Sequence, residues 1–305
     1  MKKGFTLVEL LVVIAILGML MSIILPAVNQ ARAMARLLEC KNKIRQLGLG
    51  CQTYLTKRGQ FPTSMGYHPE GPAPRGNLSG RGWICLILPQ LEQESLHRQL
   101  SVGFEGSYGS GTGMNHPDIR EAMGTVLTAL CCPDDPEVRS LNSSQFQLGG
   151  IPVAQTSYKG VLGDNKMGDG SMHPGWQNCH DTTGCRGIFY RNSYQEPVKP
   201  ATVKDGMSYT FLVGEDVCEH NTGHTAAYFT NGDYCSASPP LNFKPDPKRP
   251  GDWWDVMGFR SNHTGGANFA MADASVTFIS DEIELSVYWA LSTKAGGEII
   301  NAEDL

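Results

Sequence analysis

The sequence lacks the motifs of several common enzyme and nucleic-acid-binding classes. It contains no G-x-S-x-G, H-E-x-x-H or P-loop pattern, the usual signatures of serine hydrolases, zinc peptidases and nucleotide-binding enzymes. Positive charge is not in excess, because 25 Lys and Arg stand against 30 Asp and Glu, and a net charge of −5 gives no general affinity for nucleic acids. No internal repeat is visible. We therefore expect a protein that is not an enzyme, needs no cofactor and has no nucleic-acid partner.

A long apolar run lies at the N-terminus, where Phe5 to Leu25 form a stretch of 21 residues preceded by Lys2 and Lys3. A helix of this length just spans a bilayer core of roughly 30 Å. No A-x-A cleavage site follows Leu25, as a secretory signal peptide would require, and the small residue Gly4 precedes the run instead. The single charge inside the run is Glu9, which costs about 3 kcal/mol in a spanning helix and so indicates a function.

The segment K-G-F-T-L-V-E-L-L-V-V-I-A-I-L-G resembles the N-terminus of type IV pilins and type II secretion pseudopilins. The resemblance implies cleavage between Gly4 and Phe5 by a prepilin peptidase, followed by methylation of Phe5. It also implies that Glu9 pairs with the N-terminal amine of a neighbouring subunit during assembly, which agrees with the need of a buried carboxylate for a positive partner. Pro26 lies where pilins carry a helix-kinking proline.

The N-terminal helix is expected to continue beyond Pro26. An apolar stripe recurs at helical spacing and predicts a face that packs on the rest of the chain. Gly59 and Pro62 are expected to end the helix. This divides the chain into a leader at 1–4, a helix at 5–56 that spans the membrane at 5–25, and a globular domain at 57–305. The stripe consists of Leu37, Cys40, Ile44, Leu47, Cys51 and Tyr54.

The orientation of the membrane span receives opposing signals. After the span, Arg32, Arg36, Lys41, Lys43 and Arg45 face only Glu39, and the positive-inside rule would keep this side in the cytoplasm. Nine cysteines instead favour an oxidising compartment outside the inner membrane. We expect a single-pass inner-membrane protein with a cytoplasmic N-terminus and most of the chain in the periplasm or at the cell surface.

Nine is an odd number of cysteines, so at least one is free or pairs between chains. Cys179 and Cys185 are close enough in sequence to close a small disulfide loop, and Cys218 and Cys235 are a second candidate pair. Simple burial is the preferred interpretation of Cys40 and Cys51. A metal site is the alternative for the 173–185 segment, although its spacing matches no standard zinc pattern. Its ligands would be His173, Cys179, His180 and Cys185.

The remainder of the chain predicts an α+β fold, in which the long N-terminal helix precedes an antiparallel, pilin-like sheet domain with long loops. A short helix is expected within 83–93, another at 117–129 and a last one at 285–292. The predicted strands are 157–162, 187–190, 209–214, 267–272 and 275–279. The last two form a hairpin around Asp273-Ala274.

Several segments spread along nearly the whole chain resemble a large bacterial family that joins a prepilin-type N-terminus to a domain of unknown function, also filed under a solute-binding-protein label. The 261–280 segment resembles the processing-associated H-x9-D-G motif of that family, with His263 and Asp273 in its two named places and Ala274 in place of the glycine. The resemblance implies an envelope protein but no known activity. The other matching segments are W-I-C-L-I-L-P-Q-L-E-Q, C-P-D-D, S-Y-K-G-V-L-G, V-K-D-G-M-S-Y-T-F-L-V-G-E and K-A-G-G-E-I-I.

Three further groups of residues fit either a functional site or an ordinary structural role. His263 and Asp273 can meet across the predicted hairpin as a general-base pair, or serve the turn and the backbone. Asp164 and Asp169 lie in a short loop rich in oxygen ligands and glycine, which suits calcium or an ordinary turn. A set of four aromatic residues suits either stacking on a sugar or packing in the core. It consists of Trp176, Tyr228, Trp253 and Trp254.

The sequence thus predicts a pilin-like or pseudopilin-like envelope protein that associates, through its N-terminal helix, with copies of itself or with components of a secretion or pilus-like system. Two rivals stay open: a membrane-tethered module that binds a ligand or polysaccharide without polymerising, and an envelope hydrolase that uses His263 and Asp273.

Overall fold

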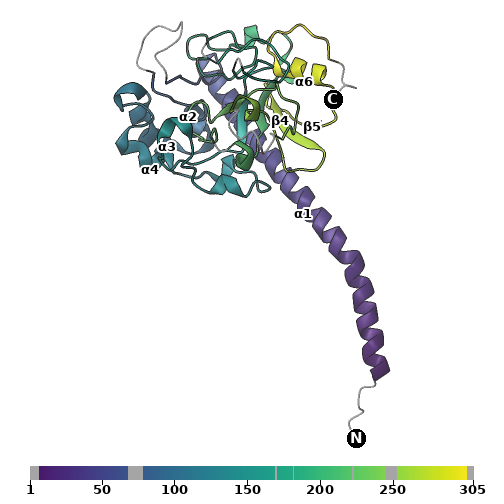
Figure 1. The fold of residues 1–305 in the computed structure, drawn as a ribbon. Helices are drawn as coiled ribbons and strands as arrows, with labels where there is room; N and C mark the ends of the chain where they lie inside the picture. The colour runs from purple at the N-terminus through teal and green to yellow at the C-terminus, as the bar shows by residue number, and fades with distance from the viewer. Residues whose placement is uncertain are drawn as a thin grey trace.

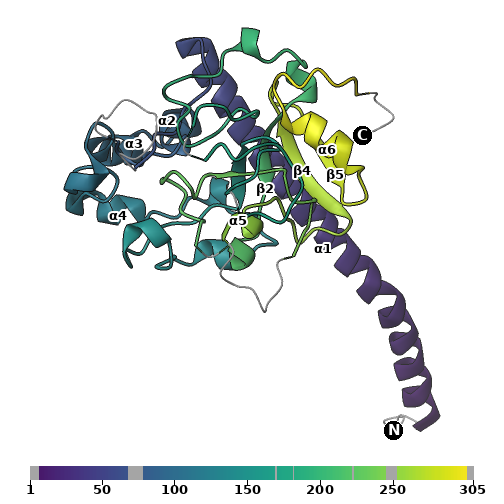
Figure 2. The same cartoon turned by 45° about the horizontal axis from the view of Figure 1, so that its top comes forward.

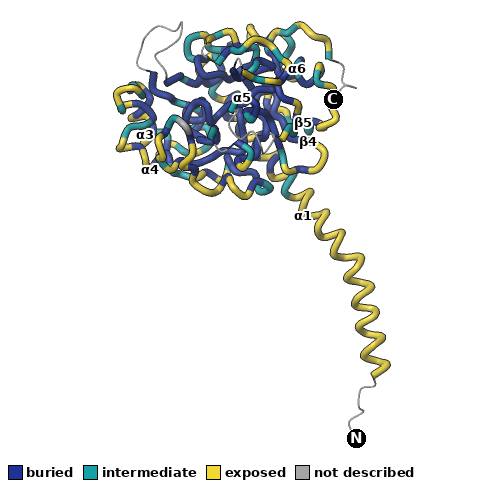
Figure 3. The backbone as a smooth tube through the Cα atoms, viewed as in Figure 1, coloured by how far each residue is buried: buried dark blue, intermediate teal, exposed yellow. Residues whose placement is uncertain are grey.

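The computed structural model describes residues 7–67, 78–168, 170–180, 182–221, 223–244 and 253–300. Its longest element is helix α1, Leu7–Arg58, which continues on both sides of Pro26 although this residue has no N–H to donate to the preceding turn. All residues from 7 to 35 are exposed, and the helix projects away from the globular part of the chain (Figures 1 and 3). The helix ends where Gly59 adopts a left-handed φ of +72°, as predicted for a C-terminal glycine.

The C-terminal half of α1 packs inside the globular domain. The predicted apolar stripe provides the contact, because Cys40, Ile44, Leu47 and Cys51 are fully buried. The helix is therefore bipartite: one half is an exposed apolar rod and the other is a core element.

A five-stranded sheet forms the centre of the domain, in the order β3-β1-β2-β4-β5. All neighbouring strands run antiparallel except β1 and β3, which are parallel. The fold is α+β and mostly antiparallel, as predicted. The strand bounds are Tyr158–Val161 for β1, Phe211–Glu215 for β2, Tyr234–Cys235 for β3, Gly266–Met271 for β4 and Val276–Ser280 for β5.

Helices cover the two faces of this sheet. On one face α1 crosses β2, β4 and β5 (Figure 2). Small side chains such as Ala270 and Ala272 permit the close approach of the helix. On the other face α6, Leu285–Ser292, packs its Tyr288 against Phe211 and Phe269. Because both faces are covered, every residue of β2 and β4 is buried.

Short helices and loops complete the domain. The remaining α-helices are α2 (Ile84–Ile87), α3 (Glu94–Leu100), α4 (Arg120–Met123) and α5 (Trp253–Val256), joined by several 3₁₀ turns. The helix expected at 117–129 is confined to α4 and two 3₁₀ turns, because Gly124 interrupts the run. The strand expected at 187–190 is wrong, since these residues pack as irregular chain over the core.

The predicted β4–β5 hairpin is present, with Ala270 opposite Val276 next to the turn. Ala274 adopts a left-handed φ of +68°, the conformation that a glycine would take more easily. The turn therefore keeps a backbone suited to glycine despite the alanine. A Cβ built on Gly48 of α1 would lie 3.1 Å from the Ala274 Cβ, so the helix offers a bare backbone opposite this alanine.

Candidate functional site

The exposed half of α1 is the first candidate site. Within the described ranges, it belongs to the one helix long and apolar enough to cross a membrane, and none of that apolar window is buried against the domain. Glu9 is exposed on this half, among Val8, Leu10 and other apolar side chains. Gly4 and Phe5 lie outside the described residues, so cleavage and methylation there stay predictions.

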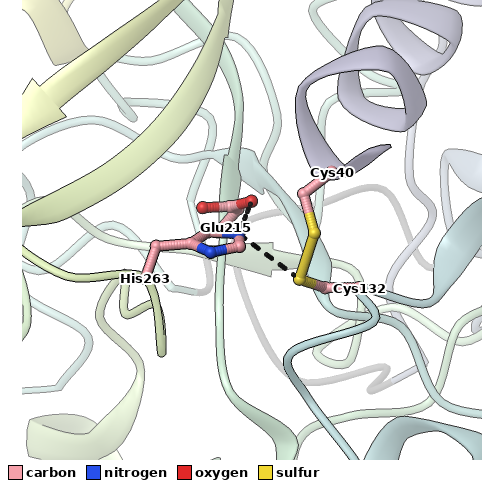
Figure 4. A group of neighbouring side chains, drawn as sticks. All are labelled: Cys40, Cys132, Glu215 and His263. Atoms are coloured by element: carbon pink, nitrogen blue, oxygen red, sulfur yellow. Dashed lines mark hydrogen bonds and ion pairs between the residues drawn. A yellow bond between two sulfur atoms is a disulfide. The ribbon is translucent and has the colours of Figure 1, made fainter. Parts of the chain in front are cut away.

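The second candidate site is a buried cluster where α1 meets the domain, shown in Figure 4. Cys40 of α1 forms a disulfide with Cys132, which begins the C-P-D-D turn. The imidazole of His263 lies beside this disulfide, with its Nε2 3.7 Å from the Cys132 Sγ. The carboxylate of Glu215, at the end of β2, approaches the same Nε2 to 3.5 Å.

His263 is held between two acids. Its Nδ1 lies 2.9 Å from the Asp134 carboxylate, on the side opposite Glu215. Asp134 also accepts a hydrogen bond from Arg36 of α1. Burial lowers the pKa of His263, but the hydrogen bond and charge of Glu215 and the charge of Asp134 outweigh it and raise the pKa above its ordinary value.

The other partners of the cluster fix its geometry. The Glu215 carboxylate accepts hydrogen bonds from the backbone N–H of Asn268 at 2.8 Å and from the Asn268 side chain at 3.1 Å. The next acid of the turn, Asp135, accepts from the Ser157 hydroxyl and the Cys218 backbone N–H. The C-P-D-D turn is thus anchored to the strand region on one side and presents Cys132 and Asp134 to α1 and His263 on the other.

Of the two alternatives for His263 and Asp273, the general-base pair is not formed in this structure. The Asp273 carboxylate instead accepts hydrogen bonds from Ser275 within the hairpin turn and from Ser208, which lies in the 3₁₀ turn before β2. These bonds outweigh the effect of partial burial and lower the pKa of Asp273. Asp273 is therefore a turn residue, as the plain alternative held, whereas His263 contacts two carboxylates rather than the backbone alone.

One of the two disulfides proposed from the sequence is present in the structure and the other is not. Cys179 and Cys185 form a disulfide that closes a small loop. Cys218 and Cys235 are free buried thiols, so the second proposed pair is wrong. Cys218 Sγ hydrogen-bonds the Thr156 backbone carbonyl and Cys235 Sγ contacts the Asp216 carboxylate, which shows that each thiol has its own place in the core.

The alternative metal site at 173–185 does not form in this structure. Its two cysteines are joined to each other, and His173 Nε2 lies 3.7 Å from Asp255. His180 Nε2 contacts the Arg191 guanidinium. Among the described residues, the group of His, Cys, Asp or Glu side chains close enough to share a metal ion is Cys40, Cys132, Glu215 and His263.

Neither the loop at Asp164 and Asp169 nor the aromatic set forms a complete binding site among the described residues. The Asp164 carboxylate is already paired with the Arg186 guanidinium at 2.5 Å, and Asp169 lies outside the described residues, so calcium there stays a prediction. Tyr228 is fully buried, and Trp253 and Trp254 are half-buried against the core. Trp176 is 56% exposed and stacks on Arg186.

Comparisons with known proteins match both the N-terminal segment and the globular part of the chain. Residues 1–25 match the prokaryotic N-terminal methylation motif, and residues 29–286 match the family described as protein of unknown function (DUF1559). The type II secretion system core protein G of Pseudomonas aeruginosa is 29% identical over 83 residues, which cover 27% of this chain and 58% of that protein. The chain therefore matches somewhat over half the length of this relative. No solved structure matches.

These observations first define the class, a pilin-like protein with a prepilin-type methylation motif and an N-terminal helix suited to membrane anchoring in the envelope. More specifically, the chain belongs to the DUF1559 family. The methylation motif implies processing by a prepilin peptidase.

Proposed function

We propose that the protein is a subunit of a pilin-like assembly, cleaved after Gly4, methylated at Phe5 and delivered with its globular domain outside the inner membrane. The observation that carries the proposal is the division of α1. Residues 7–35 are exposed and, apart from Glu9, predominantly apolar as far as Leu25, while the following turns are fixed in the core and by the Cys40–Cys132 disulfide. A projection of this kind serves both as an anchor in lipid and as a packing surface for identical rods.

Glu9 gives the rod a specific means of association. A carboxylate inside hydrocarbon is costly unless a cation neutralises it, and cleavage after Gly4 creates a cationic α-amine at the N-terminus. In a bundle of staggered rods, the Glu9 of one subunit pairs with the α-amine of the next. The similarity to the type II secretion system core protein G, 29% identity over 83 residues, supports an assembly of the pilin-like class.

The proposal assigns no catalysis to His263. The side chain of this residue is 4% exposed, and both ring nitrogens face carboxylates. A general base needs an accessible nitrogen within hydrogen-bond reach of a substrate proton. We therefore propose that the cluster has a structural role, which disfavours the envelope hydrolase. A protein in which His263→Ala abolished hydrolysis of an envelope polymer while the fold persisted would contradict this.

The first experiment is the mass of the N-terminal peptide of the protein isolated from cell membranes. A peptide that begins at N-methylated Phe5 supports processing, whereas a peptide that still carries Met1 to Gly4 identifies a plain anchor. The tethered binding module would then become the better proposal, with the exposed Trp176 as its first contact to test.

The second experiment tests assembly. Glu9→Ala should abolish chemical crosslinking between subunits in membranes, because the α-amine loses its counter-charge. Glu39→Ala is the matched control, since it removes an exposed acid from the same helix within the part that packs on the domain. Equal crosslinking in Glu9→Ala and wild type would overturn the role of Glu9.

A further inference from the structure

The cluster of Cys40, Cys132, Glu215 and His263 has the composition of a metal site. Its four side chains come from α1, the C-P-D-D turn, β2 and the segment before β4, and all are buried. One ligand atom from each lies within 4.8 Å of all the others. Figure 4 shows the His263 ring and the Glu215 carboxylate directed at the disulfide. Two sulfurs, an imidazole nitrogen and a carboxylate oxygen form a set that suits zinc.

The orientation of His263 is a second, independent observation. Its Nδ1 is engaged by Asp134, and its Nε2 points to Cys132 and Glu215. A histidine that binds a metal usually donates its other ring N–H to a carboxylate, which fixes the tautomer with a lone pair on the ligating nitrogen. Asn268 holds Glu215 in the same manner from behind. The ligands thus already have the outer partners that a metal site requires.

We propose that reduction of the Cys40–Cys132 disulfide converts this cluster into a binding site for one divalent transition metal ion of the zinc class. A dithiol reductant supplies two electrons and two protons, so that the S–S bond breaks, two thiols form and the reductant becomes a disulfide. The metal ion then displaces the two thiol protons to solvent and binds both thiolates, His263 Nε2 and the Glu215 carboxylate.

The distances fit this exchange. Zinc bonds of about 2.3 Å to sulfur and about 2.0–2.1 Å to nitrogen or oxygen place tetrahedral ligand atoms roughly 3.3–3.8 Å apart. The Cys132 Sγ and the Glu215 oxygen lie 3.7 and 3.5 Å from His263 Nε2. The main change is that the two sulfurs separate, which side-chain rotation permits. Bound metal would replace the disulfide as the link between α1 and the domain.

The experiment uses the full chain in detergent, reduced with a phosphine, freed of metal with a chelator and titrated with Co²⁺. Binding of one equivalent, with near-ultraviolet thiolate-to-cobalt absorption and visible bands of tetrahedral cobalt, is the expected result. Zn²⁺ should then displace the cobalt. The oxidised protein has the same sequence and fold and should show neither stoichiometric binding nor the thiolate-to-cobalt absorption, because its two sulfurs are bonded to each other.

Variants locate the site. Cys179→Ser/Cys185→Ser removes the other disulfide and should bind cobalt like the wild type. His263→Ala and Glu215→Gln each remove one ligand and should weaken binding, and His263→Ala should also shift the visible bands. If the reduced wild type binds no cobalt, or binds it only through Cys179 and Cys185, the proposal is wrong. Equal binding by the oxidised and reduced proteins would also overturn it, whether or not any variant folds.

Discussion

The Cys40–Cys132 disulfide should contribute more to stability than the Cys179–Cys185 disulfide, and the reason is the length of chain that each closes. The two half-cystines are 92 residues apart in the first case and 6 in the second. In the chain-entropy model, a cross-link lowers the entropy of the unfolded state by an amount that grows with the logarithm of loop length. The model gives about 5 kcal/mol for the long loop and about 2 kcal/mol for the short one.

The two double variants are Cys40→Ala/Cys132→Ala and Cys179→Ala/Cys185→Ala. They form a matched pair, because all four sulfurs are buried and each variant removes two of them. Similar packing losses therefore leave loop entropy as the main difference. The short-loop variant is the control for the effect of truncating a cystine.

The assay is urea unfolding of the full chain in detergent with a chelator present, followed by tryptophan fluorescence. The long-loop variant should lose roughly 2.4 kcal/mol more than the short-loop variant. The slope with urea should rise in both, because an uncrosslinked unfolded state exposes more surface. Equal losses, or a greater loss in the short-loop variant, would refute the entropic account and place the stabilisation in local native contacts.

Two further predictions concern the core. Burial raises the pKa of Asp233 to about 7 from 3.8, so its contribution to stability is full below about pH 4 and is lost as the pH rises towards 7. Asp233→Asn cannot ionise, so its free energy of unfolding should rise by a few kcal/mol relative to that of the wild type as the pH increases from about 4 to about 7. The measurement is the difference between the urea midpoints of the two proteins at each pH. A difference that does not change with pH would contradict the prediction. Gly48→Ala should lower the free energy of unfolding more in the wild type than in the Ala274→Gly variant, because a Cβ at position 48 would lie 3.1 Å from the Cβ of Ala274. A double-mutant cycle should give a coupling of about 0.5–2 kcal/mol between the two positions. Additive effects of the two substitutions on stability would show that the hairpin turn moves away from α1 at no energetic cost.

Local sequence patterns predicted the elements that depend on local physics. Helix α1 was predicted correctly from the 21-residue apolar run, the apolar stripe beginning at Leu37 and the helix end at Gly59. Each of these signals depends only on residues that are neighbours in the sequence. The β4–β5 hairpin was also predictable, since two alternating runs flank a two-residue turn. Strand β3 was missed because it is two residues long and gains its conformation from pairing with β1.

The buried cluster was not predictable in the same way. His263 occurs in a recognisable motif, but its partner in that motif, Asp273, lies in the hairpin turn, and the residues it contacts are 129 and 48 positions away, at Asp134 and Glu215. Only the tertiary fold brings such segments together. The C-P-D-D segment was a usable signal, because a cysteine followed by two acids offers both a disulfide partner and a histidine partner.

Two of the five basic residues that follow the membrane span, Arg36 and Lys43, contact the globular domain. By the positive-inside rule alone, Arg36 and Lys43 favour a cytoplasmic domain. Arg36 is paired with Asp134, and Lys43 donates a hydrogen bond to the Cys131 carbonyl at 2.9 Å while pairing with Glu39. Both cations therefore dock α1 against the C-P-D-D turn beside the Cys40–Cys132 disulfide. This docking gives Arg36 and Lys43 a structural role that does not depend on the side of the membrane. The orientation is therefore better tested by the fate of Gly4 and Phe5 than by counting charges.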